Sequence, residues 1–467
     1  MTTSLEYAQT NATRFEDELI DLLKIQSVST DAAFSGQIRE AADWLIEEFK
    51  KIGLSTDLIE IEGHHPIVYA EWMGAGSEAK TVLIYGHYDV QPAVMEDGWE
   101  TDPFEPVRKD DGFLYARGAT DDKGQFYTHV KAVEALLKTD DLPVNVKFII
   151  EGEEEAGGEA IAQYVQNNPE KLAADVCVIS DTSMQDIENP VIINALRGGI
   201  TFEVTVIGPR QDLHSGMFGG TIHNPAQALA EIITKLHKDD GSVAVSGFYD
   251  DVLELTEAER EEIAQVSWDN VDWSEATGAT VPWGEEDYSL LERIGARPTL
   301  EITGMASGYY GDGSKSIVPH KAIAKISCRL VANQNPQDIE KKVIKFIEKI
   351  APPTIQIKVK SLRAGALPAL IKTDTPAMQA AIAAYEKGWG AKPIFKREGG
   401  SIPIVSDFQS VLNLPVIMMG FGLNSDNLHG PNERFNLEMF HKGIATSIYF
   451  LREVAALPNT HSESDQS

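Results

Sequence analysis

The chain has 467 residues, too long for one ordinary core, and its 43% hydrophobic and 24% charged content describes a soluble globular protein of two domains. It carries 40 Lys and Arg residues against 72 Asp and Glu residues, so the formal net charge is −32. This excess of negative charge repels phosphates and argues against a nucleic acid or an anionic membrane as partner, while it is compatible with attracting cations.

Three features indicate a cytoplasmic location. Cys177 and Cys328 are the only cysteines, and each lies in an apolar, strand-like run, so no disulfide framework is expected and a reducing compartment is favoured. The N-terminal segment MTTSLEYAQTNATRFEDELIDLL lacks the basic and apolar regions of a signal peptide. No apolar stretch approaches the roughly 20 residues that a membrane span needs.

Helices and strands alternate along the first part of the chain. Helical apolar spacing over 14–23 and 36–52 precedes a buried strand over 80–90 and a helix over 127–138. After these come a strand, a helix and two further strands, in the segments VKFII, AIAQYVQ, DVCVISD and PVIINAL. This alternation predicts an α/β domain with a mostly parallel central sheet flanked by helices.

The pattern changes after residue 199. A strand over 201–208 and a helix over 224–238 lead into an acidic, Trp-bearing insertion at about 239–298. The segments TLEITG, KAIAKISCRLV, NPQDIEKKVIKFIEKI and TIQIKVKSL then read as strand, strand, helix and strand. Without the insertion the order is β-α-β-β-α-β, which is ferredoxin-like. We therefore expect a domain over 200–372 that is inserted into a discontinuous domain of 1–199 and 373–467.

Polar clusters directly follow three of the apolar strand runs of the first domain. They are His87 with Asp89, the acidic run 151–155, and Asp181. In parallel sheets, ligands collect outside the carboxyl ends of the strands. Asp121 and His429 lie in similar short polar segments. A set of two His residues with several carboxylates suits two borderline metal ions such as zinc, with one carboxylate shared between them.

The same residues also have plainer interpretations. A single His at a strand end is more often structural than catalytic, Asp89 could cap a turn, and Arg329 could be an ordinary face residue of its strand. In EGEEEAGG (151–158), a solvated turn tolerates adjacent carboxylates as well as a cation site does. Spacing alone therefore leaves open which Glu acts, and Glu153 is expected to be solvated.

Seven motifs occur in order, within a resemblance that covers about residues 14 to 455: GHYDV, ARGATDDKG, EGEEEAGG, SDTS, DLHSGMFGG, REGGSIP and LHGPNE. Together they resemble the di-zinc metallopeptidase family of carnosinases, cytosolic dipeptidases, glutamate carboxypeptidase, acetylornithine deacetylase and succinyl-diaminopimelate desuccinylase. DLHSGMFGG, CRLV and REGGSIP are most similar to the dipeptidase branch. The resemblance implies a catalytic α/β domain with an inserted ferredoxin-like α+β domain, which serves as a lid and forms a homodimer.

The resemblance also implies residue roles. Five side chains would bind two divalent metal ions, with Asp121 as the bridge: His87, Asp121, Glu155, Asp181 and His429. Glu154 would be the general base, Asp89 would fix the ring of His87, and His214 would reach the partner subunit's active site to stabilise the oxyanion. Substrate would be bound through its carboxylate by Arg329 and through its backbone by Ser316, Gly400 and Ser401.

The implied function is metal-dependent hydrolysis of dipeptides or similar short amides with a free C-terminal carboxylate. The metal is expected to be Zn²⁺, with Mn²⁺ or Co²⁺ as alternatives. The alternative on the same scaffold is an N-acyl-amino-acid deacylase or desuccinylase, or a glutamate-type carboxypeptidase. A binding protein on a decayed scaffold is disfavoured because the ligands and the base are present. One departure concerns specificity, since Arg363 stands in the segment 361–370 where the dipeptidase branch tends to have a His.

Overall fold

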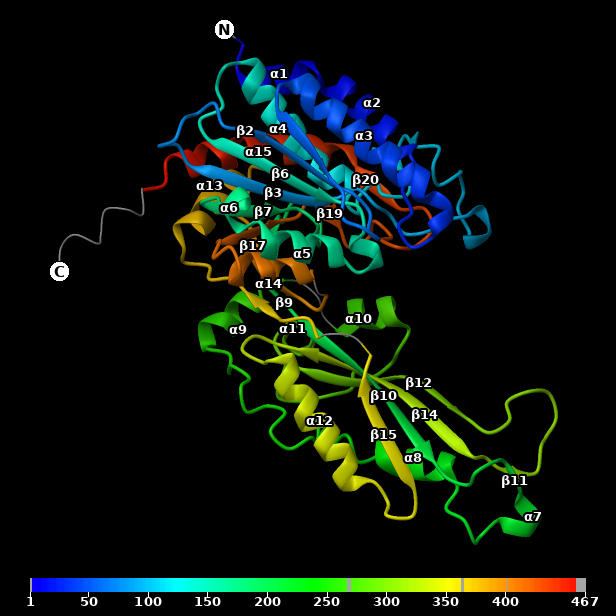
Figure 1. Cartoon of the computed structure of the whole chain (residues 1–467). Coiled ribbons are helices and arrows are strands. Elements are labelled where there is room, and N and C mark those ends of the chain that lie inside the picture. Colours follow the sequence, from blue (N-terminus) through cyan, green and yellow to red (C-terminus); the bar gives the residue numbers. More distant parts are fainter. Residues whose placement is uncertain (1, 267–269, 363–364, 401, 459–467) are drawn as a thin grey trace. The chain divides into compact units, whose positions relative to one another are not determined.

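The computed structural model describes residues 2–266, 270–362, 365–400 and 402–458. The chain forms two compact units (Figure 1). The first unit comprises Met1–Asn194, Ile371–Lys396 and Ile404–Ser467, and the second comprises Ala195–Leu370 and Arg397–Pro403. The sequence predicted domain boundaries after residues 199 and 372, and the compact units divide after residues 194 and 370. The sequence did not predict that residues 397–403 belong to the second unit.

The first unit is built on a sheet that contains the strand order β1-β2-β6-β3-β7-β18-β9, and the short strands β16 (Ala369–Leu370) and β17 (Ile394–Glu398) also pair with β9. Its strands are β1 (Ser55–Ile59), β2 (Ile67–Trp72), β3 (Thr81–His87), β6 (Asn145–Glu151), β7 (Val176–Ile179), β9 (Val191–Leu196) and β18 (Val416–Met419). The central strands β6, β3, β7 and β18 are parallel, as expected from the sequence. The margins are antiparallel, where β1 pairs with β2, β2 with β6, and β18 with β9.

Helices cover both faces of this sheet, which is why β6 is buried along its whole length. Neighbouring residues of β3 show the two faces: a side chain at Gly86 would collide with Phe126 of α4, whereas Tyr85 packs edge-on against Phe408 of α14, with ring centroids 5.7 Å apart. The helices are α1 (Ser4–Thr10), α2 (Ala12–Leu23), α3 (Ser35–Ile52), α4 (Lys123–Lys138), α5 (Glu159–Asn167), α6 (Pro169–Leu172), α13 (Pro376–Gly388), α14 (Pro403–Ser410) and α15 (Leu437–Ala455).

A buried ammonium group holds three of these helices together. Lys131 of α4 is fully buried and forms ion pairs with Glu18 of α2 at 2.6 Å, with Glu134 at 2.9 Å, and with Glu48 of α3. Burial raises the pKa of Glu18, but hydrogen bonds from Lys131 and Lys51 outweigh this effect and lower the pKa to about 2. These three carboxylates lie close enough together to bind a cation. Because the lysine already lies among them, the fold explains this cluster.

The second unit contains an antiparallel sheet of order β12-β14-β10-β15, with α8 and α12 packed on it. Its main elements are β10 (Gly198–Ile207), α8 (Pro225–Ile233), β12 (Thr299–Ser307), β14 (Lys321–Leu330), α12 (Pro336–Ile350) and β15 (Gln356–Ser361). Residues along β10 alternate between buried and partly buried, so one face of the sheet supplies the core. The order β10-α8-β12-β14-α12-β15 is the ferredoxin-like arrangement predicted from the sequence.

The acidic insertion packs onto this second unit. It contains α9 (Glu257–Ile263), α10 (Asn270–Thr277) and α11 (Leu290–Gly295), and Phe248 joins the hydrophobic core of the unit. Arg297 pairs with Glu285 at 2.8 Å and lies over the rings of Tyr249 and Tyr288, at 5.0 Å and 4.2 Å from their centroids. These contacts join separate parts of the insertion to one another.

Two further observations bear on the compartment. Cys177 on β7 and Cys328 on β14 are both buried, free thiols. In the described part of the chain, no helix combines the length and the apolar character that crossing a membrane requires.

Candidate metal centre

The side chains of the candidate site lie at the carboxyl ends of parallel strands. His87 is the last residue of β3, and Asp181 follows the end of β7 by two residues. Glu154 and Glu155 begin a short 3₁₀ turn (Glu154–Ala156) just after β6. Two loops complete the set: Asp121 lies just before α4, and His429 lies between β19 (Gly422–Leu423) and β20 (Arg434–Asn436). All of these residues belong to the first unit.

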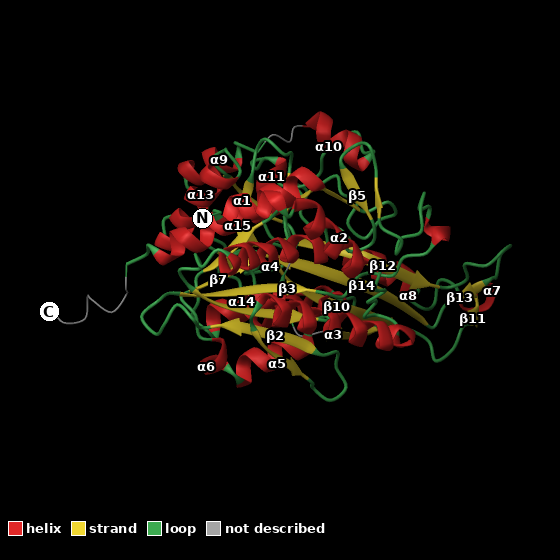
Figure 2. Cartoon of the chain, turned by 90° about the horizontal axis from the view of Figure 1, so that it is seen from above, coloured by secondary structure: helices red, strands yellow, loops and turns green. Residues whose placement is uncertain are grey.

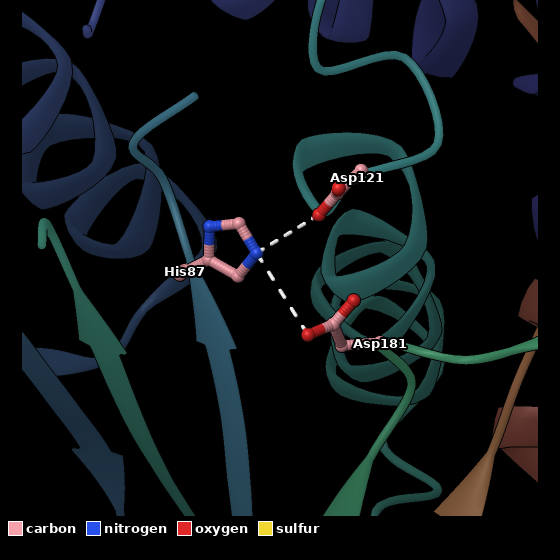
Figure 3. Close-up of side chains that lie close together, drawn as sticks. All are labelled: His87, Asp121 and Asp181. Carbon is pink, nitrogen blue, oxygen red and sulfur yellow. Dashed lines mark hydrogen bonds and ion pairs between the residues drawn. The ribbon is translucent and has the colours of Figure 1, made fainter. Parts of the chain in front are cut away.

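Two groups of donor atoms share Asp121. In the first group, Nε2 of His87 lies 3.1 Å from Oδ1 of Asp121 and 3.8 Å from Oδ2 of Asp181 (Figure 3). In the second, Nε2 of His429 lies 3.0 Å from Oδ2 of Asp121 and 3.3 Å from Oε1 of Glu155. Within each group the donor atoms lie within 4.8 Å of one another. Asp121 therefore presents one oxygen to each group, as a carboxylate between two cations would.

Asp89 orients both sides of this centre. Its backbone carbonyl lies 3.0 Å from Nδ1 of His87 and its Oδ1 lies 3.4 Å from the same atom, so Nδ1–H can donate there while Nε2 faces the carboxylates. Its carboxylate also accepts hydrogen bonds from the backbone N–H groups of Glu154 and Glu155, at 3.2 Å and 3.0 Å. Both interpretations of Asp89, as partner of the His87 ring and as cap of a turn, therefore apply.

The electrostatics of the cluster favour a bound cation. Burial and the neighbouring charge of Asp121 raise the pKa of Asp181 to about 8. Burial also raises the pKa of Glu154 to about 7, against the opposing effect of His87. Hydrogen bonds to Asp121 and Glu155 raise the pKa of His429 to about 10. Because divalent cations stabilise crowded carboxylates, and His with carboxylate oxygen suits zinc-like ions, these residues fit a two-metal site.

Three residues around the acidic run have roles that the sequence did not reveal. Glu153 was expected to be solvated, and this prediction is wrong, because its side chain is buried. Its carboxylate accepts hydrogen bonds from the backbone N–H groups of His65 at 3.0 Å and Ala160 at 2.8 Å, and lies 2.9 Å from Nδ1 of His64. Glu151 accepts a hydrogen bond from Tyr85 at 2.6 Å. The side-chain amide of Gln91 donates to Oε2 of Glu155 at 2.6 Å. In the sequence, only the position of Gln91 two residues after Asp89 indicates that it lies near the site.

The remaining candidates lie in the second unit, at two separate places. His214 of β11 (Leu213–His214) pairs with Ile317 of β13 (Ile317–Val318), and the N–H of Ser215 donates to the carbonyl of Ser316 at 3.0 Å. His214 and Ser316 are therefore neighbours. Figure 2 shows their strands, β11 and β13, side by side. The N–H of His320 donates to Oδ1 of Asp212, which ties the paired strands β11 and β13 to the start of β14.

Arg329 lies near the opposite end of β14, where it pairs with Gly199 of β10 and Thr299 of β12. The N–H of Arg197 donates to the carbonyl of Gly400 at 3.0 Å, which brings the 397–403 segment to the same end. Arg329 stands eight residues after Lys321, so at about 3.3 Å per residue the two ends of the strand lie roughly 26 Å apart. Ser401 and Arg363 lie outside the described residues.

The chain is similar to one family of peptidases and to several of its members. A family model described as "Peptidase family M20/M25/M40" matches residues 83–453. The chain is 34% identical over 458 residues to the Cys-Gly metallodipeptidase dug1 of Schizosaccharomyces pombe, covering 95% of this chain and 96% of that protein. It is 34% identical over 397 residues to the Beta-Ala-His dipeptidase of Homo sapiens, covering 84% and 78%. The solved structure of the M20 family metallo-carboxypeptidase Sso-CP2 from Sulfolobus solfataricus matches with a TM-score of 0.84 and 33% identity, covering 95% and 99%.

Proposed function

The chain belongs to the peptidase family M20/M25/M40, and on that premise we propose that it is a metal-dependent dipeptidase. Its substrates would be dipeptides or similar short amides with a free C-terminal carboxylate. The two dipeptidase relatives, which match most of the chain, support this activity. They do not favour the alternative of an N-acyl-amino-acid deacylase, a desuccinylase or a glutamate-type carboxypeptidase.

The observation that carries the proposal is the pair of donor groups joined by Asp121. His87, Asp121 and Asp181 would hold one divalent ion, and Asp121, Glu155 and His429 would hold the other. Imidazole and carboxylate donors support Zn²⁺, although Mn²⁺ and Co²⁺ accept the same ligands. When bound, such a pair of ions supplies Lewis acidity to the substrate carbonyl and lowers the pKa of a water molecule.

Within this site Glu154 acts as the general base. It is partly buried beside the donor groups without belonging to either, and burial raises its pKa above that of an ordinary Glu, which favours uptake of a proton. Glu154 takes a proton from the attacking water, whose oxygen bonds to the carbonyl carbon. It then returns that proton to the nitrogen of the leaving amine as the C–N bond breaks. The Asp89 carboxylate holds the backbone of the turn that carries this base.

Arg329 would bind the substrate's C-terminal carboxylate bidentately, and Gly400 and Ser401 would contact its backbone. His214 would stabilise the oxyanion of the tetrahedral intermediate, with Ser316 beside it. A dipeptide is far shorter than the roughly 26 Å that separates the two ends of β14. Because His214 lies at one end and Arg329 at the other, one subunit cannot supply both to the same substrate, which supports a homodimer with His214 acting across the interface.

Exposed apolar side chains support the same dimer. Met217 is 73% exposed on α7 (Ser215–Phe218), next to His214, and Tyr310 is 93% exposed in the loop that leads to β13. Their sequence neighbours Phe218 and Tyr309 are exposed as well, and several large apolar side chains gathered on the segments next to the paired strands β11 and β13 are typical of a surface that a protein partner covers. We also propose a cytoplasmic location, which the two free thiols support.

A substrate panel tests this function. The metal-loaded protein is expected to hydrolyse dipeptides, and to act at least about tenfold more slowly, in kcat/KM, on tripeptides and on N-acetyl and N-succinyl amino acids. Amine release is measured for each compound under identical conditions. Cleavage of the N-acyl amino acids without cleavage of any dipeptide would establish the alternative instead, and preferred removal of the last residue from longer peptides would indicate a carboxypeptidase.

A further inference from the structure

Glu433 holds the loop that carries Asp121. Its side chain is fully buried and accepts four hydrogen bonds from one short segment. Oε2 accepts from Nη1 of Arg117 at 2.7 Å and from the N–H of Gly118 at 3.0 Å. Oε1 accepts from the N–H groups of Thr120 and Asp121, at 3.0 Å and 3.1 Å. One carboxylate therefore fixes the backbone on both sides of the turn that presents Asp121.

The same residue connects this loop to the second histidine. Glu433 stands four residues after His429, and its backbone carbonyl accepts the N–H of Ala116 at 3.1 Å. Arg117 extends the link, because its Nη2 donates to the carbonyl of Gly430 at 3.3 Å while its guanidinium lies 5.3 Å from the ring centroid of Trp99. The segment just before Asp121 and the segment around His429 are thus joined by a buried ion pair.

We propose that the Arg117–Glu433 pair is a positioning device, which sets the distance between Asp121 and His429 and thereby the metal affinity of the donor group that these two share with Glu155. This inference rests on the proposed function. A buried ion pair whose carboxylate accepts hydrogen bonds at both oxygens holds its surroundings in one arrangement. Partners that orient metal ligands in this way typically change metal affinity by about 10- to 100-fold when they are replaced.

Glu433→Gln is the direct test. The amide nitrogen of glutamine cannot accept a hydrogen bond, so it would face two N–H donors in a buried site where the carboxylate oxygen now accepts both. Mn²⁺ is titrated into metal-free protein by calorimetry, and the Kd of one of the two bound ions is expected to rise about 10- to 100-fold relative to wild type. The absorption bands of bound Co²⁺ should also change shape, because the ligand geometry changes.

Glu48→Gln is the matched control. Glu48 is another buried Glu of the first unit, and it forms an ion pair with Lys131 of α4. Lys131 lies about two helical turns after Lys123, the first residue of α4, and so is remote from Asp121 along this helix. Glu48→Gln should lower the thermal stability and leave the Mn²⁺ affinity of the folded protein unchanged. An equal loss of affinity in both variants would show general destabilisation and would overturn the proposal, as would an affinity of Glu433→Gln within about twofold of wild type.

A second variant keeps the test decisive where Glu433→Gln does not fold. Arg117→Lys keeps the positive charge beside Glu433 but loses the second donor to the carbonyl of Gly430. It is expected to weaken Mn²⁺ binding in the same direction, and unchanged binding in folded Arg117→Lys would contradict the positioning role. Failure of the wild-type protein to bind either Zn²⁺ or Mn²⁺ is a different outcome, since it would refute the proposed function itself.

Discussion

Replacing Glu154 with Gln is expected to lower kcat for dipeptide hydrolysis by about 10²- to 10⁴-fold while two metal ions remain bound. The amide is nearly the same size as the carboxylate but cannot take a proton from water or return it to the leaving amine. Because Glu154 belongs to neither donor group among the described residues, its replacement should leave metal affinity unchanged. The measurement is single-turnover hydrolysis together with metal content after dialysis.

The neighbouring variant Glu155→Gln is the matched control. Oε1 of Glu155 lies 3.3 Å from Nε2 of His429, in the donor group with Asp121. Glu155→Gln should therefore lose metal on dialysis and recover part of its activity in excess metal, which Glu154→Gln should not do. An exchange of these two results would show that the base and the ligand are assigned one residue out of place. Near-normal hydrolysis by Glu154→Gln would remove the proposed mechanism.

Mixing two inactive variants is expected to restore activity. Arg329→Ala should lose most of its activity because the substrate carboxylate loses its bidentate partner, and His214→Ala should lose it because the oxyanion loses a donor. If His214 acts across the interface, a mixed dimer contains one intact site, made of Arg329 from one subunit and His214 from the other. Random exchange of subunits would then give about a quarter of the wild-type activity.

The same mixture distinguishes the two possible arrangements. If both side chains served the substrate of their own subunit, every site in the mixed dimer would lack one of them, and the mixture would stay as inactive as its components. Mixing each variant with itself is the control for effects of exchange, and light scattering confirms that the variants remain dimers. A monomeric wild-type protein with full activity would also contradict the role of His214 in the partner's site.

The residues at strand ends could be predicted because their signal is local. His87 and Asp181 directly follow runs of buried apolar residues, and the carboxyl ends of parallel strands meet at one edge of the sheet. Spacing did not decide between Glu154 and Glu155, since both stand in one acidic run, and only the resemblance of the motifs separated them. The structure places Glu155, and not Glu154, with the oxygen and nitrogen donors of Asp121 and His429.

The supporting contacts could not be predicted because they join distant parts of the chain. Glu433 and Arg117 are 316 residues apart in sequence, and nothing near either residue indicates the other. Glu153 was expected to be solvated because acidic runs usually are, but a loop 88 residues earlier supplies the N–H of His65 to its carboxylate. In the same way, the return of 397–403 to the second unit depends on backbone pairing with Arg197, which leaves no local pattern.

The most direct test of the two-metal dipeptidase is the rate of dipeptide hydrolysis by metal-free protein as Zn²⁺ or Mn²⁺ is added in known equivalents. The shared position of Asp121 between two donor groups predicts no activity without metal and a full rate only when two ions are bound per chain. Full activity with one ion per chain, or hydrolysis that persists in a chelator after metal removal is verified, would contradict it.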